Sequence, residues 1–284
     1  MERIGVVGCG LMGSGIAEIA ARAGAGVVVI ERDADALASG QARIERSLSR
    51  AVAAGKMPES EADQARANLT FSEDFSLLAD REMVIEAVAE DEATKIEVFK
   101  KLDAIVTSRD AILATNTSSI PIIKLAMVTG RPEQVVGVHF FNPVPVLKLV
   151  EVISSLLTSA ETTQRVRDYA GGPLGKKVIT SKDRAGFVVN ALLIPYLLSA
   201  IRMLESGFAS AEDIDNGMVL GCAHPLGPLA LTDLIGLDTT LAVADSLYAE
   251  FKEPHLAPPP LLSRMTQAGL MGRKSGQGFY SYKA

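Results

Sequence analysis

Short apolar runs alternate with helical patterns along the first half of the chain. The apolar runs are rich in Val and Ile, which is typical of strands buried on both faces of a sheet. They occupy residues 4–7, 26–30, 83–88, 111–115 and 135–138. Helical patterns follow several of these runs, among them patterns at about residues 34–54 and 91–105. Because strands and helices alternate, we expect an α/β fold with a doubly wound parallel sheet.

The pattern changes near residues 183–186. Beyond this point, residues 187–204 are apolar on nearly every side of a helix, so that helix must be buried in a bundle or an interface. We therefore expect an α/β domain over residues 1–184 and an all-helical domain over residues 185–284. The other expected elements are a strand from about Leu147, a helix near 160–170, a strand at 177–180, and helices after Ser210, at 239–250 and after Pro260.

A glycine-rich turn joins the first apolar run to a helix of small residues. It has the form G-x-G-x-x-G, with a strand before it and a helix after it. In such a turn Gly8 makes the bend, Gly10 lets the backbone approach a pyrophosphate, and Gly13 lets the helix pack closely on the strand. Glu31 ends the second apolar run, where Rossmann-type domains hold an acid for the adenosine ribose. The sequence predicts a Rossmann-type domain that binds NAD, although Arg32 leaves NADP open.

Composition and charge exclude several classes of protein. Of the 284 residues, 48% are hydrophobic, which is enough for a continuous core. The net charge of -6 and the pI near 5.3 argue against nucleic-acid binding, which needs a basic face. The longest apolar run, residues 187–201, is too short for a membrane span. Because Cys9 and Cys222 are too few for a disulfide framework and no signal peptide precedes the first strand, we expect a cytoplasmic protein.

His139 is the strongest candidate for chemistry. It follows the apolar run at 135–138, at the carboxyl end of a predicted strand, where open α/β sheets bind ligands. The next predicted strand carries Glu151, and a carboxylate bound to one imidazole nitrogen leaves the other able to take a proton. A lone His beside a strand is more often a packed, hydrogen-bonded residue. The chain has only three His, and a nucleotide signature lies upstream, so we favour the catalytic interpretation.

Two further polar groups have both a structural and a functional interpretation. Arg43, Arg46 and Arg50 share a helix face and Lys56 follows the end of that helix. They form either a solvated charged face or a landing site for a phosphorylated part of a substrate. The Ser residues at 116–121 precede a Pro and a helix, which is typical of a helix cap, but one hydroxyl is available to face a ligand.

Four motifs give the chain a resemblance to a known family. They are Asn116-Thr117-Ser118-Ser119, His139-Phe140-Phe141-Asn142-Pro143-Val144-Pro145, Gly186-Phe187-Val188-Val189-Asn190 and Gly276-Gln277-Gly278-Phe279-Tyr280. The chain resembles the L-3-hydroxyacyl-CoA dehydrogenases, closest to the bacterial 3-hydroxybutyryl-CoA dehydrogenases, from Ile4 to Tyr280. The resemblance implies a Rossmann-type domain, an all-helical C-terminal domain that forms most of a homodimer interface, and an active site between them.

The resemblance also implies a role for each site residue. His139 would be the catalytic base with Glu151 as its partner, while Ser118 would bind the substrate oxygen and Asn190 the acyl-CoA. For NAD it implies Gly8, Gly10, Leu11, Met12, Gly13, Glu31, Glu90, Lys95, Ser118, Asn142 and Lys274, and for coenzyme A it implies Ser47, Lys56, Ser118 and Asn190. The implied reaction interconverts a short-chain L-3-hydroxyacyl-CoA and its 3-ketoacyl-CoA without a metal, in fatty-acid or butanoate metabolism.

Two alternatives stay open at this point. A dehydrogenase of a free hydroxy acid, similar to L-gulonate 3-dehydrogenase, would use the same His–Glu pair without coenzyme A; the basic residues near Arg43 favour coenzyme A. A non-catalytic protein on this scaffold, similar to a lens crystallin, would bind cofactor without turnover. The presence of Ser118, His139, Glu151 and Asn190 together argues against it. The family often has Asp where this chain has Glu31, which bears on the choice between NAD and NADP.

Overall fold

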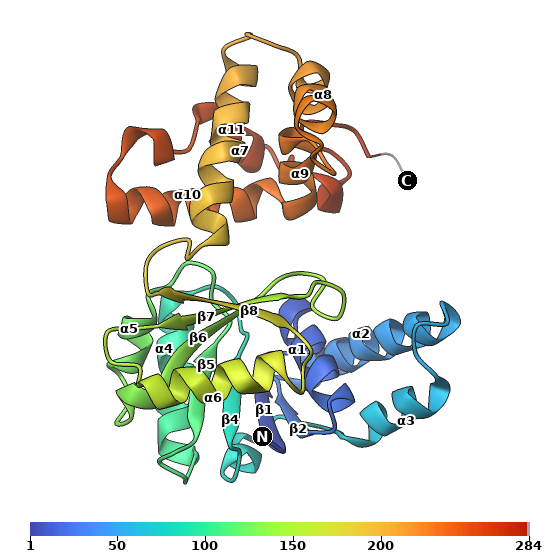
Figure 1. The fold of residues 1–284 in the computed structure, drawn as a ribbon, viewed down its shortest axis with the longest axis vertical. Coiled ribbons are helices and arrows are strands. Elements are labelled where there is room, and N and C mark those ends of the chain that lie inside the picture. The colour runs from blue at the N-terminus through green and yellow to red at the C-terminus, as the bar shows by residue number, and fades with distance from the viewer. Residues whose placement is uncertain (283–284) are drawn as a thin grey trace. The chain divides into compact units, whose positions relative to one another are not determined.

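In the computed structural model, which describes residues 1–282, the chain divides into the units Met1–Arg184 and Ala185–Ala284. The first unit contains a sheet with helices on it, and the second is built of helices (Figure 1). The predicted fold class, a Rossmann-type α/β domain followed by a helical domain, is confirmed. Within the described residues, no helix combines the length and the apolar character needed to cross a membrane.

An eight-stranded sheet forms the centre of the first unit, in the order β3-β2-β1-β4-β5-β6-β7-β8. The strands β3 to β6 in this order are all parallel, whereas β7 is antiparallel to β6 and β8 is parallel to β7. The order reverses between β1 and β4, and open sheets bind ligands outside the strand ends at such a switch point. The strands are β1 (Arg3–Val7), β2 (Gly26–Ile30), β3 (Leu69–Ser72), β4 (Met83–Glu86), β5 (Ile112–Thr115), β6 (Val135–Phe140), β7 (Leu149–Ser154) and β8 (Lys177–Lys182).

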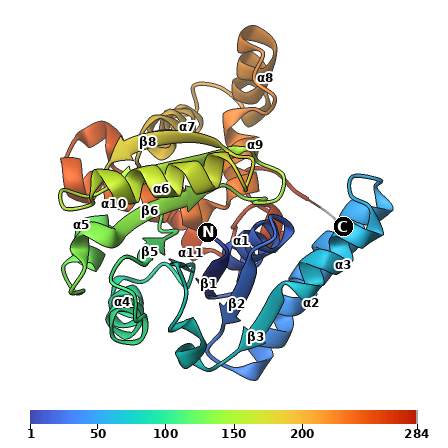
Figure 2. The same ribbon diagram turned by 60° about the horizontal axis from the view of Figure 1, so that its bottom comes forward.

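Helices cover both faces of this sheet (Figures 1 and 2). Several begin at the capping side chains that the sequence supplies: Asp33, Asp91 and Ser159 accept backbone N–H groups at the starts of α2, α4 and α6. The apolar face of α1 and α6 packs on one side of the sheet, while α5 lies on the other, where Ile122 approaches Gly137 of β6. The helices are α1 (Leu11–Arg22), α2 (Ala34–Ala53), α3 (Glu59–Ala67), α4 (Glu92–Ile105), α5 (Ile122–Ala126) and α6 (Ala160–Gly171).

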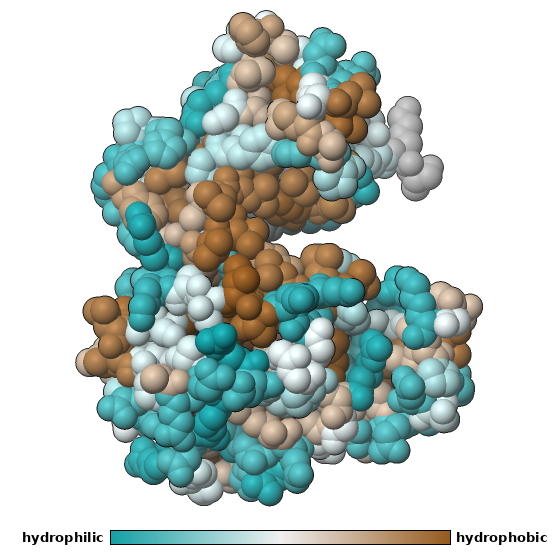
Figure 3. All heavy atoms as spheres, viewed as in Figure 1, coloured by the Kyte–Doolittle hydropathy of each residue, from teal (hydrophilic) through white to brown (hydrophobic). Residues whose placement is uncertain are grey.

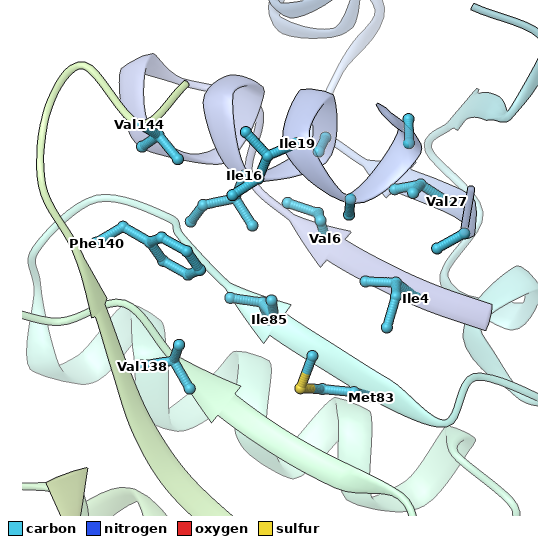
Figure 4. Close-up of a cluster of buried hydrophobic side chains, with 14 of the residues drawn as sticks. Ile4, Val6, Ile16, Ile19, Val27, Met83, Ile85, Val138, Phe140 and Val144 are labelled. Atoms are coloured by element: carbon cyan, nitrogen blue, oxygen red, sulfur yellow. The ribbon is translucent and has the colours of Figure 1, made fainter. Parts of the chain in front are cut away.

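The core under α1 anchors the strand that carries His139. Figure 4 shows Val138 and Phe140 of β6 pointing into the same cluster as Ile16 and Ile85. Phe140 is 2% exposed. Because side chains alternate along a strand, His139 between them points to the opposite face of the sheet. The apolar residues on either side of His139 therefore hold its backbone in place.

The second unit has a hydrophobic core of its own, centred on α7. The sequence predicts this helix from residue 187, but it begins at Val189, because Phe187 has a left-handed φ of 48°. The helix expected after Ser210 is present as α8, and the Ser210 hydroxyl caps it by accepting the Asp213 N–H. The helices are α7 (Val189–Glu205), α8 (Ala211–Cys222), α9 (Pro228–Ile235), α10 (Leu237–Phe251) and α11 (Pro260–Gln267).

The elements α3, β3 and α9 have no counterpart in the sequence prediction. All are short, with 4 to 9 residues each. In α3 only Ala62 and Ala65 are buried, and no residue of β3 is fully buried because it is an edge strand. The strand predicted at 83–88 is also too long, because β4 ends at Glu86 and leaves Glu90 in the following loop.

Candidate active site

His139 and Glu151 face each other on neighbouring strands. β6 and β7 pair antiparallel in a register that sets these residues directly opposite one another. Nδ1 of His139 lies 2.7 Å from Oε2 of Glu151, Glu151 is fully buried, and His139 is 7% exposed. The structure thus brings the two predicted residues together, while their catalytic role stays a prediction.

The position of the carboxylate determines which imidazole nitrogen can do chemistry. Glu151 accepts a hydrogen bond from Nδ1, so the neutral ring carries its proton there and has its lone pair on Nε2. The Phe141 ring lies beside the imidazole, with 4.6 Å between the ring centroids and a tilted arrangement of the two rings. A carboxylate also stabilises the imidazolium that forms when Nε2 takes a proton. The geometry of the pair therefore suits general acid–base chemistry at Nε2 of His139.

The loop that carries Ser118 is held by Glu90. One carboxylate oxygen of Glu90 accepts from the Thr117 hydroxyl, from the Ser118 N–H at 3.0 Å and from both the N–H and the hydroxyl of Ser119 at 3.2 and 3.0 Å. Partial burial raises the pKa of Glu90, but the Lys95 ammonium and these donors outweigh it, and the net pKa is lowered. Glu90 is therefore a carboxylate that positions the backbone of Ser118.

Lys95 lies between two carboxylates. Its ammonium, 1% exposed, is 2.6 Å from Glu86 and 3.3 Å from Glu90. Glu86 is fully buried and also accepts from the Thr115 hydroxyl at 2.7 Å and from the Val88 N–H at 2.7 Å. The predicted residues Lys95, Glu90 and Ser118 thus belong to one hydrogen-bonded group at the ends of β4 and β5.

The glycine turn leaves room for a ligand on one side only. A Cβ on Gly13 would lie 1.8 Å from the carbonyl oxygen of Gly8, whereas a Cβ on Gly10 would have nothing within 4 Å. A pocket of about 500 Å³ lies beside the turn and is lined by Gly8, Gly10, Glu31 and Arg43 among others. Gly13 therefore serves the packing of α1 on the turn, and Gly10 faces open space.

Glu31 lies at the end of β2 and contacts the glycine turn. Its carboxylate accepts the Cys9 N–H at 2.6 Å and the Arg32 N–H at 3.0 Å. Arg43 donates to the Cys9 carbonyl at 3.2 Å, so it too lies at the turn. Burial, followed by the Glu31 charge, raises the pKa of the Cys9 thiol to about 12. Cys9 is therefore a packing residue rather than a nucleophile.

Two of the residues predicted to bind coenzyme A, Ser47 and Lys56, lie on α2 and just after it. Lys56, Arg46 and Arg50 are exposed, and the Ser47 hydroxyl faces the buried carboxylate of Glu18 on α1. Burial raises the pKa of Glu18, and hydrogen bonding to Ser47 partly opposes the shift. Arg43 is set apart from the other arginines by its bond to the glycine turn.

The remaining predicted residues are Asn142, Asn190 and Lys274. Asn142 is exposed in the loop between β6 and β7 and precedes a cis peptide bond to Pro143. In the helical unit, Asn190 is half-buried in the first turn of α7, and the Lys274 ammonium lies 2.5 Å from Asp238. Across residues 1–282, no group of three or more His, Cys, Asp or Glu side chains could hold a metal ion.

Comparison with known proteins identifies the family. Residues 3–184 match the family model for the NAD-binding domain of 3-hydroxyacyl-CoA dehydrogenase, and residues 186–282 match the model for its C-terminal domain. The chain belongs to the 3-hydroxyacyl-CoA dehydrogenase family. The predicted resemblance is thereby confirmed, and so is the expectation of a domain built to bind NAD.

Individual similar proteins align with nearly the whole chain. A 3-hydroxybutyryl-CoA dehydrogenase of Mycobacterium tuberculosis is 57% identical over 282 residues, which is 99% of each chain. The crystal structure of Mycobacterium tuberculosis FadB2 has a TM-score of 0.99 and 56% identity and covers 100% of this chain and 99% of its own. The structure of (S)-3-hydroxybutyryl-CoA dehydrogenase PaaH1 from Ralstonia eutropha has a TM-score of 0.95 and 44% identity and covers 100% of both chains.

The α/β unit of this dehydrogenase fits the NAD that its family implies. The open space at Gly10 admits a pyrophosphate close to the backbone, and the start of α1 supplies N–H groups for it. The same pocket extends to Glu31, whose carboxylate is placed for a ribose hydroxyl. Glu31 and the glycine turn are thus joined by one pocket, as the spacing in the sequence predicts.

Three residues of the dehydrogenase's α/β unit escaped the prediction. Glu86 binds Lys95, the amide of Asn116 accepts the Phe140 N–H, and Lys176 donates to the carbonyls of Val144 and Leu147 at 2.6 and 2.7 Å. Glu86 ends β4 and Asn116 follows β5. A polar side chain next to such apolar runs needs a hydrogen-bond partner, so the sequence does indicate that these two residues have partners. For Lys176 the sequence carries no comparable signal.

Proposed function

We propose that this dehydrogenase interconverts short-chain L-3-hydroxyacyl-CoA, such as 3-hydroxybutyryl-CoA, and the matching 3-ketoacyl-CoA, with NAD as cofactor. The observation that carries the proposal is the buried His139–Glu151 pair, which supplies the acid and base that the reaction needs. The names of the similar proteins support the short-chain substrate, since the relatives from Mycobacterium tuberculosis and Ralstonia eutropha are both 3-hydroxybutyryl-CoA dehydrogenases.

The side chains divide the proton chemistry between them. In the oxidative direction, Nε2 of His139 takes the proton of the 3-hydroxyl group, and Glu151 stabilises the resulting imidazolium. NAD held at the glycine turn and Glu31 would supply the hydride acceptor for the same carbon. In the reductive direction the imidazolium of His139 returns its proton to the forming alkoxide. Ser118 donates a hydrogen bond to the substrate oxygen and so orients it towards Nε2.

The binding roles follow the predicted assignments. Gly8 to Gly13 and Glu31 hold the pyrophosphate and the adenosine ribose, and Glu90, Lys95, Ser118, Asn142 and Lys274 complete the NAD site. Ser47, Lys56, Ser118 and Asn190 bind the acyl-CoA. The preference for NAD rests on Glu31, because its carboxylate repels a 2′-phosphate.

An assay separates this proposal from its alternatives. Initial rates are measured with acetoacetyl-CoA and with free hydroxy acids, using NADH or NAD and then NADPH or NADP. We expect turnover of acetoacetyl-CoA with NADH and little turnover of free acids. Faster turnover of free acids would favour the alternative similar to L-gulonate 3-dehydrogenase, and NADH binding without turnover of either class would favour a non-catalytic protein.

We also propose a homodimer formed through the helical unit. Apolar side chains at its surface support this, and Figure 3 shows hydrophobic residues there. Leu192 on α7 is 73% exposed, Phe208 79% and Leu220 on α8 81%. The sequence predicts that the apolar helix α7 is buried, and a partner chain would cover the side of it that carries Leu192. Light scattering should give twice the chain mass, and Leu220→Glu should shift it towards the monomer.

The proposed setting is the cytoplasm, in fatty-acid or butanoate metabolism. The state of the cysteines supports a reducing compartment, since both Cys9 and Cys222 are free thiols. Fractionation of the native host, probed with an antibody to the protein, tests the location. Enrichment outside the cytoplasmic fraction would contradict it.

A further inference from the structure

The sheet beside the catalytic histidine is incomplete on one side. The pairing of β5 with β6 ends where Thr115 lies opposite Gly137. β6 continues to Phe140, and on its other side β7 pairs with it to the end, with Val150 opposite Phe140. The last residues of β6, His139 included, therefore extend beyond the backbone support of β5.

Asn116 supplies the missing support. Its own N–H donates to the Glu86 carbonyl at 2.8 Å, which continues the β4–β5 ladder by one residue. Its side-chain oxygen then accepts the Phe140 N–H at 2.9 Å. A side-chain amide thus takes the place of a strand carbonyl and binds the residue that follows His139.

We propose that Asn116 is a positioning residue for His139. The bond to the Phe140 N–H fixes the end of β6 on the β5 side, while Glu151 fixes the imidazole from the β7 side. A proton transfer depends steeply on such alignment, because a displacement of about 1 Å is able to cost about 100-fold in rate. The inference rests on the proposed function, since it concerns the same proton transfer.

The shape of Asn116 allows a matched set of variants. Asn116→Leu keeps a similar volume without the acceptor, and Asn116→Asp keeps an acceptor oxygen at the same place. Asn68 is the control, because its side chain also binds a distant backbone group, the Ala21 carbonyl at 2.9 Å, on α1 rather than at the end of β6. Asn68→Leu therefore reports the cost of losing such a bond away from His139.

The first measurement is steady-state kinetics with acetoacetyl-CoA and NADH, and with 3-hydroxybutyryl-CoA and NAD. For Asn116→Leu we expect kcat to fall about 10-fold to 100-fold in both directions, with KM values within about twofold of the wild type. Asn116→Asp should recover most of the kcat, and Asn68→Leu should keep it. An unchanged kcat in Asn116→Leu, or a rise in KM alone, would overturn the proposal.

The second measurement is amide hydrogen exchange, which needs no activity. In Asn116→Leu the Phe140 amide should lose protection by about tenfold or more, while the amides of Val136 and Val138 keep theirs. Retained protection at Phe140 would also overturn the proposal.

If the leucine variant does not fold, Asn116→Ser replaces it in both measurements. A wild type without turnover of acetoacetyl-CoA would refute the proposed function instead, and the exchange result would still judge Asn116.

Discussion

The two chemical regions of the α/β unit are built in opposite ways. At the glycine turn, room for the cofactor comes from missing side chains within one short segment, Gly8 to Gly13. At the His139–Glu151 pair, the proposed function depends on side chains that are present on two strands and on the register between them. The first region should therefore be damaged by added atoms, and the second by removed or neutralised ones. The predictions below test this contrast.

The largest effect is expected for His139→Gln. Glutamine fills much of the same space but has no group that accepts and returns a proton at neutral pH, so kcat should fall about 100-fold to 10,000-fold. NADH binding, followed by fluorescence titration, should stay close to that of the wild type. Near-normal turnover would remove His139 from the mechanism.

A smaller loss of kcat, about 100-fold, is expected for Glu151→Gln. The amide keeps the packing but removes the charge that stabilises the imidazolium, and it is able to favour the wrong tautomer. The double variant with His139→Gln should be little slower than His139→Gln alone, since the two residues act as one unit. Fully additive losses would show that Glu151 acts separately.

The glycine turn offers a matched pair of variants. Gly13→Ala forces a Cβ to within 1.8 Å of the Gly8 carbonyl and should lower the free energy of unfolding by about 2–3 kcal/mol. Gly10→Ala meets no atom within 4 Å, so its Tm should not change, but its methyl group should weaken NADH binding about tenfold. Calorimetry and NADH titration measure both variants. A stable Gly13→Ala, or normal NADH affinity in Gly10→Ala, would contradict the assignment of these roles.

The smallest effect is expected from the pH dependence of Glu90. Its pKa is lowered in the folded protein, because Lys95 and the donors of the 117–119 loop outweigh its burial. A carboxyl group with a lowered folded pKa stabilises the fold above its unfolded pKa, and this contribution is lost as the pH falls through the folded pKa.

The test compares Glu90→Gln with the wild type in urea unfolding at pH 7 and at lower pH values. The variant should be less stable at pH 7, and the difference should shrink as the pH falls below about 5. Glu92→Gln, which removes a largely exposed pair with Lys124, is the control and should show little of this change. A difference that stays constant with pH would mean that the Glu90 charge does not hold the loop.

Local patterns explain how much of this molecule was predictable. The glycine turn and Glu31 directly after β2 are set by neighbours in the chain, and the structure joins them by one pocket, as the sequence predicts. The positions of His139 and Glu151 on successive strands were also readable. The functional roles of Ser118, Asn190 and Lys274 came from the resemblance and stay predictions.

The parts that were missed depend on partners far away in sequence. Asn116 binds the backbone 24 residues further on, and Glu90 binds a loop 27 to 29 residues away. No pattern of spacing specifies such bonds, because they form only after the strands are ordered. The edge strand β3 escaped for a related reason, since an edge position weakens the burial pattern that reveals a strand.

By itself the sequence determined most of the order of strands and helices, the glycine turn and the residue types able to move a proton, because each depends on backbone preferences or side-chain chemistry over a few neighbouring residues. Only the tertiary structure decided that β7 runs antiparallel to β6, which sets Glu151 directly opposite His139. It likewise decided which carboxylates hold Lys95 and which amide completes the sheet, because hydrogen bonds between distant segments follow from packing rather than from sequence spacing.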